Sequence, residues 1–410
     1  MKNVGVIGLG YVGIPLSLSL IKAGYFVSGF DKNEAVVEAL NNSDCLLELW
    51  QERVSREVQV DVNARFASSS EVLNGADAVV ICVPTPLDAE GNPDHGYVDA
   101  AVSEILKMES LPSLVILEST VSPGYTRQGI VDRLNSEADR VIGEEIHVCF
   151  SPEREDPGNE VFSNVEIPKV IGGFTAECLA KGAELYMPVF NHVVRASSLE
   201  SAELCKLHEN TFRAININYV NELRDFAAAI DIDFDEVVAL AKTKPFGFMP
   251  FDPGIGVGGH CIPVDPHFLL KAARDKGVEL RAVEDTMQSI HASPKKIARW
   301  IEKQCEIAGD QSVLITGAAY KDGVSDIRCS PAIEVINALS DSISIHVWDP
   351  LVALVEKGGD TIHSLSDEEF RSFEGVVAIV NAQGRKFVDH NCLAAKRVID
   401  ARYKLVMNVD

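Results

Sequence analysis

Near its start the chain reads Asn3-Val4-Gly5-Val6-Ile7-Gly8-Leu9-Gly10-Tyr11-Val12-Gly13, an apolar strand-like run that leads into a GxGxxG turn. Residues 14–23 follow directly and are apolar-rich, as expected of a helix. A second apolar run, residues 25–30, ends in Asp31, 18 residues after Gly13. Strand, glycine turn, helix, strand and acid together form the fingerprint of a dinucleotide-binding fold. We therefore expect cofactor contacts at Gly8, Gly10, Tyr11, Val12, Gly13, Asp31 and Lys32.

Asp31 also favours one dinucleotide over the other. A carboxylate at this position holds the hydroxyls of the adenosine ribose and repels a 2′-phosphate, so it favours NAD over NADP. The neighbouring Lys32 weakens that preference. The sequence thus predicts NAD as the cofactor.

The composition narrows the class of protein. The 410 residues are enough for two to three domains, and 46% hydrophobic with 24% charged residues is typical of a globular chain. The net charge of −24 argues against a nucleic-acid partner, because phosphate contacts need clustered basic residues. No run of about 18 apolar residues and no charged leader is present, so we expect a cytoplasmic protein without a membrane partner. Nine scattered cysteines without a CxxC pair predict neither a disulfide framework nor a metal site.

Polar residues follow three further strand-like runs. Residues 78–83 precede Thr85, residues 114–117 precede Thr120, and residues 146–150 precede Glu153. Ligands of open parallel sheets bind beyond the carboxyl ends of the strands, so these three side chains are candidate site residues. The alternative is that each belongs to a turn or a helix cap, where Ser, Thr and Pro are common.

A long segment without Gly or Pro, from about residue 197 to 230, predicts a helix in the middle of the chain. Glu203, Lys206, Asn210 and Arg213 are spaced by three, four and three residues, which places them on one helix face. On an ordinary helix this face would be exposed to solvent. Residues 234–241 form a second helical pattern.

The run Gly254-Ile255-Gly256-Val257-Gly258-Gly259-His260-Cys261-Ile262-Pro263-Val264-Asp265-Pro266 fits neither helix nor strand. It places a cysteine and a carboxylate four residues apart on a glycine-rich loop. Cys261 is a strong nucleophile if neighbouring cations favour its thiolate. The alternative is a structural loop with a buried cysteine.

After Pro294 the pattern of the first domain returns without its GxGxxG turn. We therefore predict an α/β protein with two Rossmann-like doubly wound domains, joined by a long central helix and a helical middle domain. The expected boundaries are 1–196, 197–293 and 294–410. Tyr320, Lys321 and Arg328 follow the first strand of the second sheet, where they suit a phosphate or a nucleotide.

These motifs together resemble the nucleotide-sugar 6-dehydrogenase family over essentially the whole chain. The resemblance rests on the GxGxxG turn, Glu118-Ser119-Thr120-Val121, Lys206 with Asn210, Gly258-Gly259-x-Cys261-x-Pro263-x-Asp265, and Tyr320-Lys321 through Arg328-x-Ser330-Pro331. Residues 151–158 and 260–266 look like the N-acetylhexosamine branch, since UDP-glucose enzymes usually carry Lys where Val264 stands. Residues 243–248, Thr-Lys-Pro-Phe-Gly-Phe, look like UDP-N-acetylglucosamine 6-dehydrogenases. N-acetylmannosamine enzymes tend to carry His and Arg at Pro245 and Gly247, and their substrate is the alternative.

The resemblance implies a four-electron oxidation of the sugar C6 alcohol to a carboxylate with two NAD, through a thiohemiacetal and a thioester on Cys261. The implied catalytic residues are Cys261, Lys206, Asn210, Asp265, Thr120 and Glu153. The implied substrate contacts are Arg154, Glu155, Lys206, Asn210, Arg213, Phe246, Gly258, Tyr320 and Lys321. Thr85, Thr120 and Arg328 would contact the cofactor.

The resemblance also favours a homodimer or a higher homo-oligomer. Ile215, Ile217 and Val220 lie off the predicted catalytic face of the long helix and would suit the core of a dimer interface. A two-electron hydroxyacid-type dehydrogenase is the alternative of a different class. It shares the first domain and a Lys/Asn pair on a helix, but it needs neither a nucleophilic cysteine nor a second nucleotide domain.

Overall fold

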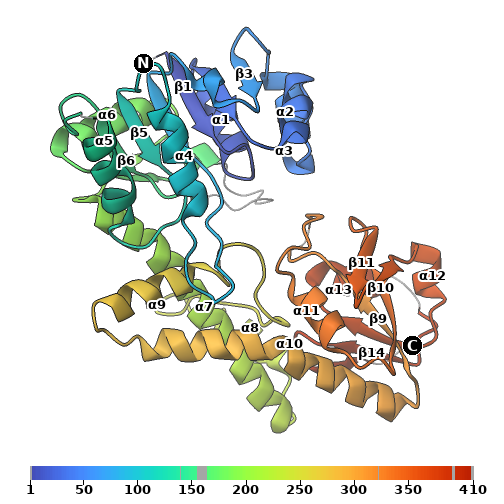
Figure 1. Cartoon of the computed structure of the whole chain (residues 1–410). Coiled ribbons are helices and arrows are strands. Elements are labelled where there is room, and N and C mark those ends of the chain that lie inside the picture. The colour runs from blue at the N-terminus through green and yellow to red at the C-terminus, as the bar shows by residue number, and fades with distance from the viewer. Residues whose placement is uncertain (1, 139, 155–163, 322, 390–392, 408–410) are drawn as a thin grey trace. The chain divides into compact units, whose positions relative to one another are not determined.

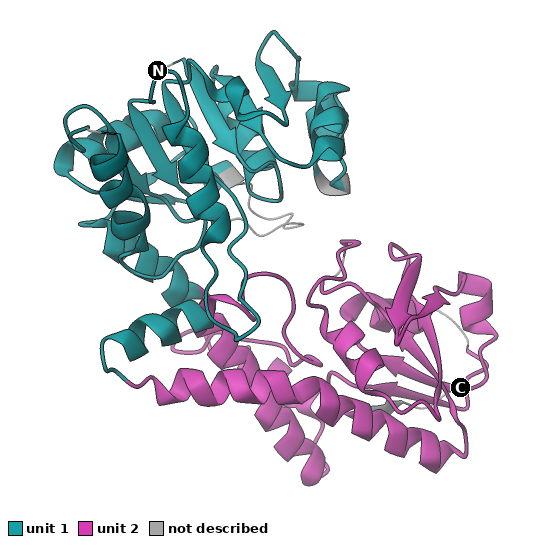
Figure 2. Cartoon of the chain, viewed as in Figure 1, with its two compact units in different colours: residues 1–209, 267–278 teal, residues 210–266, 279–410 magenta. Residues whose placement is uncertain are grey.

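The computed structural model describes residues 2–138, 140–154, 164–321, 323–389 and 393–407. These residues divide into two compact units, drawn in different colours in Figure 2. Unit 1 comprises residues 1–209 and 267–278, and unit 2 comprises residues 210–266 and 279–410. The division of the chain into three domains at residues 196 and 293 stays a prediction.

Unit 1 contains an eight-stranded sheet with the order β3-β2-β1-β4-β5-β6-β7-β8 (Figure 1). The first six strands are parallel and follow the strand order of the dinucleotide-binding fold. Strand β7 runs antiparallel to β6, and β8 is parallel to β7. The strands are β1 (Asn3–Ile7), β2 (Phe26–Phe30), β3 (Ala64–Ala67), β4 (Ala78–Ile81), β5 (Leu114–Leu117), β6 (His147–Phe150), β7 (Lys169–Gly173) and β8 (Val193–Arg195).

Both faces of this sheet are buried, which explains the nearly continuous apolar runs of its central strands. On β4, for example, Ala78 and Val80 belong to one hydrophobic core, whereas Val79 and Ile81 belong to the other. The helices of unit 1 before α7 are α1 (Gly13–Lys22), α2 (Glu34–Asn41), α3 (Glu48–Glu57), α4 (Gly96–Leu106), α5 (Asp132–Glu137) and α6 (Ala176–Tyr186), with a π-helical turn at Thr126–Val131.

Four helices follow: α7 (Leu199–Ala229), α8 (Phe234–Ala241), α9 (Asp265–Asp275) and α10 (Arg281–Ala308). The boundary between the units falls within α7 and within α9. Helix α10 begins at Arg281 and continues through Pro294, although a proline usually ends or kinks a helix. A proline in mid-helix costs one main-chain hydrogen bond, and the apolar face of α10 offsets that cost because Met287, Ile290, Ile297 and Ile301 are all buried.

The sheet of unit 2 has the order β10-β9-β13-β14-β15, with β15 antiparallel to β14. Its strands are β9 (Ser312–Thr316), β10 (Ser344–Trp348), β13 (Val376–Ile379), β14 (Arg397–Asp400) and β15 (Leu405–Met407), and a separate hairpin is formed by β11 (Leu354–Lys357) and β12 (Asp360–His363). The helices are α11 (Pro331–Ala338), α12 (Asp367–Arg371) and α13 (Ala382–Asp389). The predicted fold class, with two doubly wound sheets and a long central helix, is confirmed.

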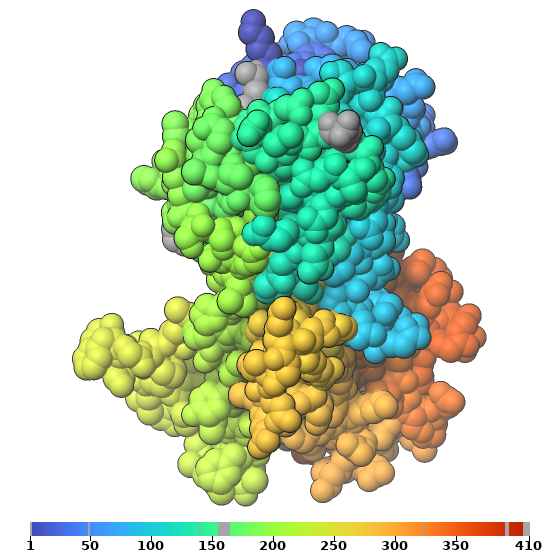
Figure 3. Space-filling view, turned by 60° about the vertical axis from the view of Figure 1, so that its left-hand side comes forward, coloured from blue at the N-terminus to red at the C-terminus, as the bar shows by residue number. Residues whose placement is uncertain are grey.

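The C-terminal half of α7 and all of α8 belong to unit 2. Figure 3 shows α8 and the residues after it, in yellow-green, projecting outward.

Among the described residues, no helix is long and apolar enough to span a bilayer.

Candidate active site

The glycine turn of unit 1 has the geometry that a dinucleotide requires. Gly8 has a φ of +92°, and a Cβ on it would lie 2.6 Å from the carbonyl oxygen of Cys82. A Cβ on Gly13 would lie 1.8 Å from the carbonyl oxygen of Gly8, so only glycine lets α1 pack this closely on β1. Gly10 has no atom within 4 Å of its missing Cβ, which leaves an open approach to the main chain.

Asp31 lies beside this turn, at the carboxyl end of β2. Its Oδ2 accepts a hydrogen bond from the Leu9 amide at 2.7 Å, and its Oδ1 accepts one from the Asn33 amide at 2.8 Å. No side chain caps the N-terminus of α1, and the positive end of its helix dipole favours a pyrophosphate there. The turn, the acid and the open helix end together fit NAD. Tyr11 and Val12 are half-buried in the turn, and Lys32 is exposed.

Two predicted residues follow the strands β4 and β5. Thr85 and Thr120 are both half-buried. The Ser119 hydroxyl donates to the carbonyl oxygen of Val83 at 2.7 Å, which ties the segment before Thr120 to the one before Thr85.

Glu203 of α7 holds the turn after Thr120. This fully buried carboxylate accepts hydrogen bonds from the main-chain amides of Gly124, at 2.5 Å, and Thr126, at 2.9 Å. Burial raises the pKa of Glu203, while the hydrogen bonds from Thr126 and Gly124 oppose that shift. The sequence gives Glu203 a place on the Lys206 face but no role.

A buried cluster of charges surrounds Glu153. Lys169 Nζ contacts Glu118 Oε2 at 2.9 Å and Glu153 Oε2 at 3.0 Å, and the Tyr186 hydroxyl donates to Glu118. Burial raises the pKa of Glu118 to about 7 against the opposing charge of Lys169. Burial acts in the same direction on Glu153, but Lys169 and Lys206 outweigh it and lower the pKa of this carboxyl.

Lys206 is buried on α7 and donates from Nζ to the main-chain oxygen of Glu153 at 2.5 Å. The next residue, Arg154, forms an ion pair with Glu209 at 2.7 Å and also donates to the Pro168 carbonyl oxygen. Glu155 lies outside the described residues. Unit 1 thus brings Lys206 and Glu153 into direct contact.

In unit 2 the side chains of three residues hold the main chain at the start of the glycine-rich loop. Asn221 Oδ1 accepts from the Gly254 amide at 2.9 Å, and the guanidinium of Arg224 donates to the Gly254 carbonyl at 2.6 Å. The Ser293 hydroxyl donates to the carbonyl of Ile255 at 3.1 Å. Arg224 is almost fully buried, although it is a charged residue. None of these three anchoring residues is predicted from the sequence.

The later glycines of the loop lie against the segment that contains Tyr320. A Cβ on Gly258 would lie 2.7 Å from Pro331 Cδ and 2.8 Å from both Tyr320 Cβ and the Cys329 carbonyl oxygen. Gly259, with a φ of +80°, packs against the Tyr320 ring. The loop therefore depends on the absence of side chains at these positions.

Cys261 is exposed and lies where this loop turns into α9. Its carbonyl oxygen accepts from the amide of Asp265, the first residue of α9, at 2.8 Å. The N-terminal end of a helix favours negative charge, so this position suits a thiolate. Asp265 is buried, and its Oδ2 accepts from the Asn210 amide at 2.6 Å.

The other predicted contacts of unit 2 are distributed as follows. Tyr320 and Lys321 are half-buried, and Arg213 and Phe246 are exposed. Arg328 is exposed but forms a two-pronged ion pair with the buried Asp326, at 2.9 and 2.7 Å. Arg328 is therefore not a free cation in this structure.

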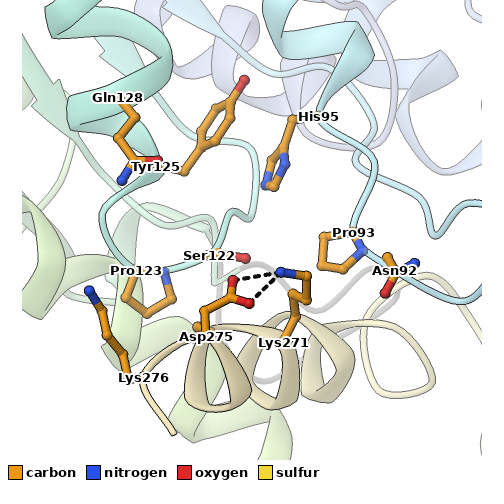
Figure 4. A pocket seen from close by; sticks show the side chains of 11 residues that line it. Asn92, Pro93, His95, Ser122, Pro123, Tyr125, Gln128, Lys271, Asp275 and Lys276 are labelled. Atoms are coloured by element: carbon orange, nitrogen blue, oxygen red, sulfur yellow. Dashed lines mark hydrogen bonds and ion pairs between the residues drawn. The ribbon is translucent and has the colours of Figure 1, made fainter.

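A pocket of about 380 Å³ lies in another part of unit 1 (Figure 4). The His95 and Tyr125 rings stack on one side of it with their centroids 3.9 Å apart. Opposite them lies the ion pair of Lys271 and Asp275, two residues of α9. None of the residues predicted for the active site lines this pocket.

Three family models match the chain in succession. The NAD binding domain of the UDP-glucose/GDP-mannose dehydrogenase family matches residues 2–190, its central domain matches residues 200–290, and its UDP binding domain matches residues 314–406. The chain belongs to the UDP-glucose/GDP-mannose dehydrogenase family. It is thus an NAD-dependent UDP-sugar 6-dehydrogenase, and both the predicted family and the predicted cofactor are confirmed.

Members of the family with different sugar substrates are similar to this chain. It is 32% identical to the UDP-N-acetyl-D-glucosamine 6-dehydrogenase of Salmonella typhi, over 93% of this chain and 90% of the relative. It is 30% identical to the UDP-N-acetyl-D-mannosamine dehydrogenase of Pyrococcus horikoshii, over 90% of each. The solved structure of a UDP-D-ManNAc dehydrogenase from Pyrococcus horikoshii superposes with a TM-score of 0.84 at 27% identity, over 93% of this chain and 89% of that one.

Several residues that contact the candidate site were not predicted from the sequence. Glu118 stands in the motif that also contains Thr120, and its place directly after a buried strand was a usable signal. Lys169, Tyr186, Asn221 and Arg224 carry no such signal. They contact residues of the predicted site only because distant segments of the dehydrogenase fold meet. Among the described residues, no cluster of His, Cys, Asp or Glu is arranged to hold a metal ion.

Proposed function

We propose that this dehydrogenase oxidises the C6 alcohol of UDP-N-acetylglucosamine to the carboxylate, giving UDP-N-acetylglucosaminuronate with the consumption of two NAD. The observation that carries the proposal is the position of Cys261. It is an exposed cysteine at the entrance to α9, on a loop whose start is hydrogen-bonded to Asn221, Arg224 and Ser293. A two-electron dehydrogenase has no use for a nucleophile held in this way.

The first oxidation converts the alcohol into an aldehyde with the loss of a hydride and of the hydroxyl proton, for which Lys206, Asp265 and Glu153 are the candidate bases. Bound NAD supplies the hydride acceptor in both oxidation steps. Lys206 and Asn210 are four residues apart on α7 and both buried, so they form a polar patch on one helix face. We assign them to the oxyanions that develop at C6, where each donor is typically worth about 3–4 kcal/mol.

Cys261 acts in the second half of the reaction. Its thiolate adds to the aldehyde carbon to give a thiohemiacetal, and the loss of a second hydride leaves a thioester. One water then adds to the thioester carbonyl, the C–S bond breaks, and Cys261 leaves as a thiolate while the acid product forms. Asp265 is the candidate for receiving the proton of the attacking water, and Thr120 and Glu153 are candidates for holding that water.

The UDP part of the substrate belongs to unit 2, which contains the UDP binding domain. We assign Tyr320, Lys321 and Arg213 to this part, with Gly258 and Phe246 closer to the sugar. On the other unit, Arg154 and Glu155 are the proposed sugar contacts. We assign Arg328 to the cofactor, together with Thr85. Arg328 would then contact NAD either while it stays paired with Asp326 or after it has left that ion pair.

The gluco configuration is proposed from residues 243–248, which lack the His and Arg typical of N-acetylmannosamine enzymes. The 32% identity to a UDP-N-acetyl-D-glucosamine 6-dehydrogenase supports this choice. UDP-N-acetylmannosamine is the second candidate, because a relative with that name is 30% identical.

We also propose that the enzyme is a homodimer. Its interface would use a different face of α7 from the one predicted with Ile215, Ile217 and Val220. Val220 is buried against Ala227, Phe234 and Val238 of its own chain, so it is not available to a partner. Phe212, Tyr219 and Phe226 instead form an exposed stripe on α7, with exposed fractions of 41%, 55% and 61%. Their spacing of seven residues is that of a helix-packing seam.

The test counts NADH per sugar consumed. Purified enzyme with excess NAD and limiting UDP-N-acetylglucosamine should give two NADH per sugar, and the variant Cys261→Ser should not complete this reaction. Cys329→Ser, which alters another exposed cysteine of the same unit, is the matched control and should keep the stoichiometry. One NADH per sugar, unaffected by Cys261→Ser, would contradict the thioester route. Turnover only with UDP-N-acetylmannosamine would retain the mechanism and change the substrate.

A further inference from the structure

Lys169 is the most deeply buried lysine that the mechanism above does not use. It is the first residue of β7, and its side chain is 3% exposed. Because β7 runs antiparallel to β6, its first residue lies at the edge of the sheet where β5 and β6 end. The pairing of Phe150 with Gly172, continued outward, places Lys169 opposite Glu153.

The charge on Lys169 is stabilised by two carboxylates. Burial opposes an ammonium, but Glu118 and Glu153 raise the pKa of Lys169 well above its usual range. Removing one member of such a buried cluster leaves the other charges without compensation, which is costly. Lys169 is therefore a permanent cation inside unit 1.

This cation fixes Glu153, and Glu153 in turn holds Lys206. The Oε2 atom of Glu153 contacts Lys169 at 3.0 Å, and its Oε1 accepts from the amide of Arg154 at 2.7 Å. The main-chain oxygen of the same residue accepts from Lys206 Nζ at 2.5 Å. Two groups assigned to the reaction thus depend on one lysine whose own side chain is buried.

We propose that Lys169 is a positioning residue, which keeps the Glu153 carboxylate ionised and oriented and, through Glu153, directs Lys206. The inference rests on the proposed function of Glu153 and Lys206, and it adds to it a residue that neither the motifs nor the family models assign.

The proposal makes a specific statement about pH. Without Lys169, burial would act on Glu153 with less opposition, so its pKa would rise and the carboxylate would be lost at mildly acidic pH. The ionisable groups that face this carboxyl come from five elements and the segments after them: Cys82 after β4, Glu118 after β5, Lys169 on β7, Tyr186 on α6, Lys206 on α7, and the adjacent Arg154.

The experiment compares kcat and KM of the full-length enzyme from pH about 5 to about 9 for the wild type, Lys169→Met, Lys169→Gln and Lys169→Arg. The two neutral variants should lose about 100-fold in kcat at neutral pH with little change in KM, because misplaced catalytic groups cost about that much. Their kcat should also fall more steeply towards pH 5 than that of the wild type does. Lys169→Arg should restore the pH profile of the wild type, because it retains the charge. Lys181→Met, on α6 with a side chain that is 40% exposed, is the matched control and should behave as the wild type.

Circular dichroism and the dissociation constant for NAD report folding independently of turnover. If a neutral variant is folded and its kcat is reduced by the same factor at every pH, the inference is overturned. A purely structural role would change the amount of active enzyme but not the pH dependence of kcat. Unchanged kcat in either neutral variant would overturn it too. If the wild type fails to turn over any UDP-sugar, the proposed function fails first, and the two failures are thereby distinguished.

Discussion

Asn210 donates a hydrogen bond from Nδ2 to Asp265 Oδ2 at 2.6 Å, and both side chains are buried. This contact joins the central helix α7 to the first residue of α9, four residues after Cys261. A buried carboxylate that loses its donor retains its desolvation cost, which is typically about 1–3 kcal/mol.

Asn210→Ala should therefore lower kcat by about 100-fold, since it removes an oxyanion donor and leaves Asp265 less well oriented. Steady-state kinetics with the UDP-sugar measures the effect. The control is Asn218→Ala, which removes an asparagine of the same helix whose amide contacts only Glu222 in the hydrogen bonds described. Similar activity in the two variants would contradict the role of Asn210.

Gly258→Ala should abolish most of the activity while the protein remains folded. The added Cβ would come within 2.7–2.8 Å of Pro331, Cys329 and Tyr320, so the loop that contains Cys261 must move. A displacement of about 1 Å can cost about 100-fold in rate. Gly254→Ala is the matched control, because the nearest atom to its new Cβ would be 3.5 Å away. Equal effects of the two alanines on kcat would argue against steric positioning of the loop.

Glu118→Gln should change how stability depends on pH. Burial raises the pKa of Glu118 from 4.5 to about 7, so the folded protein holds this proton more tightly than the unfolded chain does. The wild type therefore loses stability as pH rises from about 4.5 to about 7, and the loss stays constant above that range. The glutamine variant cannot ionise at this position and does not suffer that loss.

The free energy of unfolding of Glu118→Gln relative to the wild type should thus rise by about 2.5 kcal/mol between pH 5 and pH 8. The pKa shift is worth about 1.4 kcal/mol per unit, and part of its effect is already present at pH 5. Urea unfolding at the two pH values measures it. Glu109→Gln removes an exposed carboxylate of the same unit and serves as the control. If the two proteins differ in free energy of unfolding by the same amount at both pH values, the raised pKa of Glu118 is contradicted.

Phe226→Asp should convert the proposed homodimer into a monomer, because it places a charge in the exposed apolar stripe of α7. Light scattering after size-exclusion chromatography gives the mass directly. Tyr97→Asp alters a similarly exposed aromatic residue, 55% exposed, in unit 1 and should leave the mass unchanged. A monomeric wild type, or a Phe226→Asp variant that stays dimeric, would sink the proposed interface.

Much of the site follows from local patterns in the sequence. The GxGxxG turn, Asp31 and the glycine-rich loop before Cys261 are each encoded within a few consecutive residues, because glycine conformation and strand ends are local properties. The extent of α10, in contrast, does not follow from a local pattern. A proline normally interrupts a helix, but burial of the apolar face of α10 outweighs it.

Helix α7 is a second case in which burial could not be predicted from a local pattern. The spacing of Glu203, Lys206, Asn210 and Arg213 predicts a common face, and on a typical helix that face would be exposed. Glu203, Lys206 and Asn210 are in fact buried, whereas Arg213 is exposed. Periodicity identifies which residues share a side of a helix, but not which side is covered.

The sequence by itself determined the family, the cofactor, the two doubly wound sheets and the glycine-rich loop that contains Cys261, because each has a motif of fixed spacing. Only the tertiary structure revealed the groups around that chemistry. Lys169 contacts Glu118 and Glu153 because an antiparallel strand begins where two parallel strands end, and Arg224 reaches Gly254 from 30 residues away. Such contacts depend on strand direction and on burial. A charge inside a protein is tolerated only beside a partner, and the partner is chosen by the fold and not by its place in the chain.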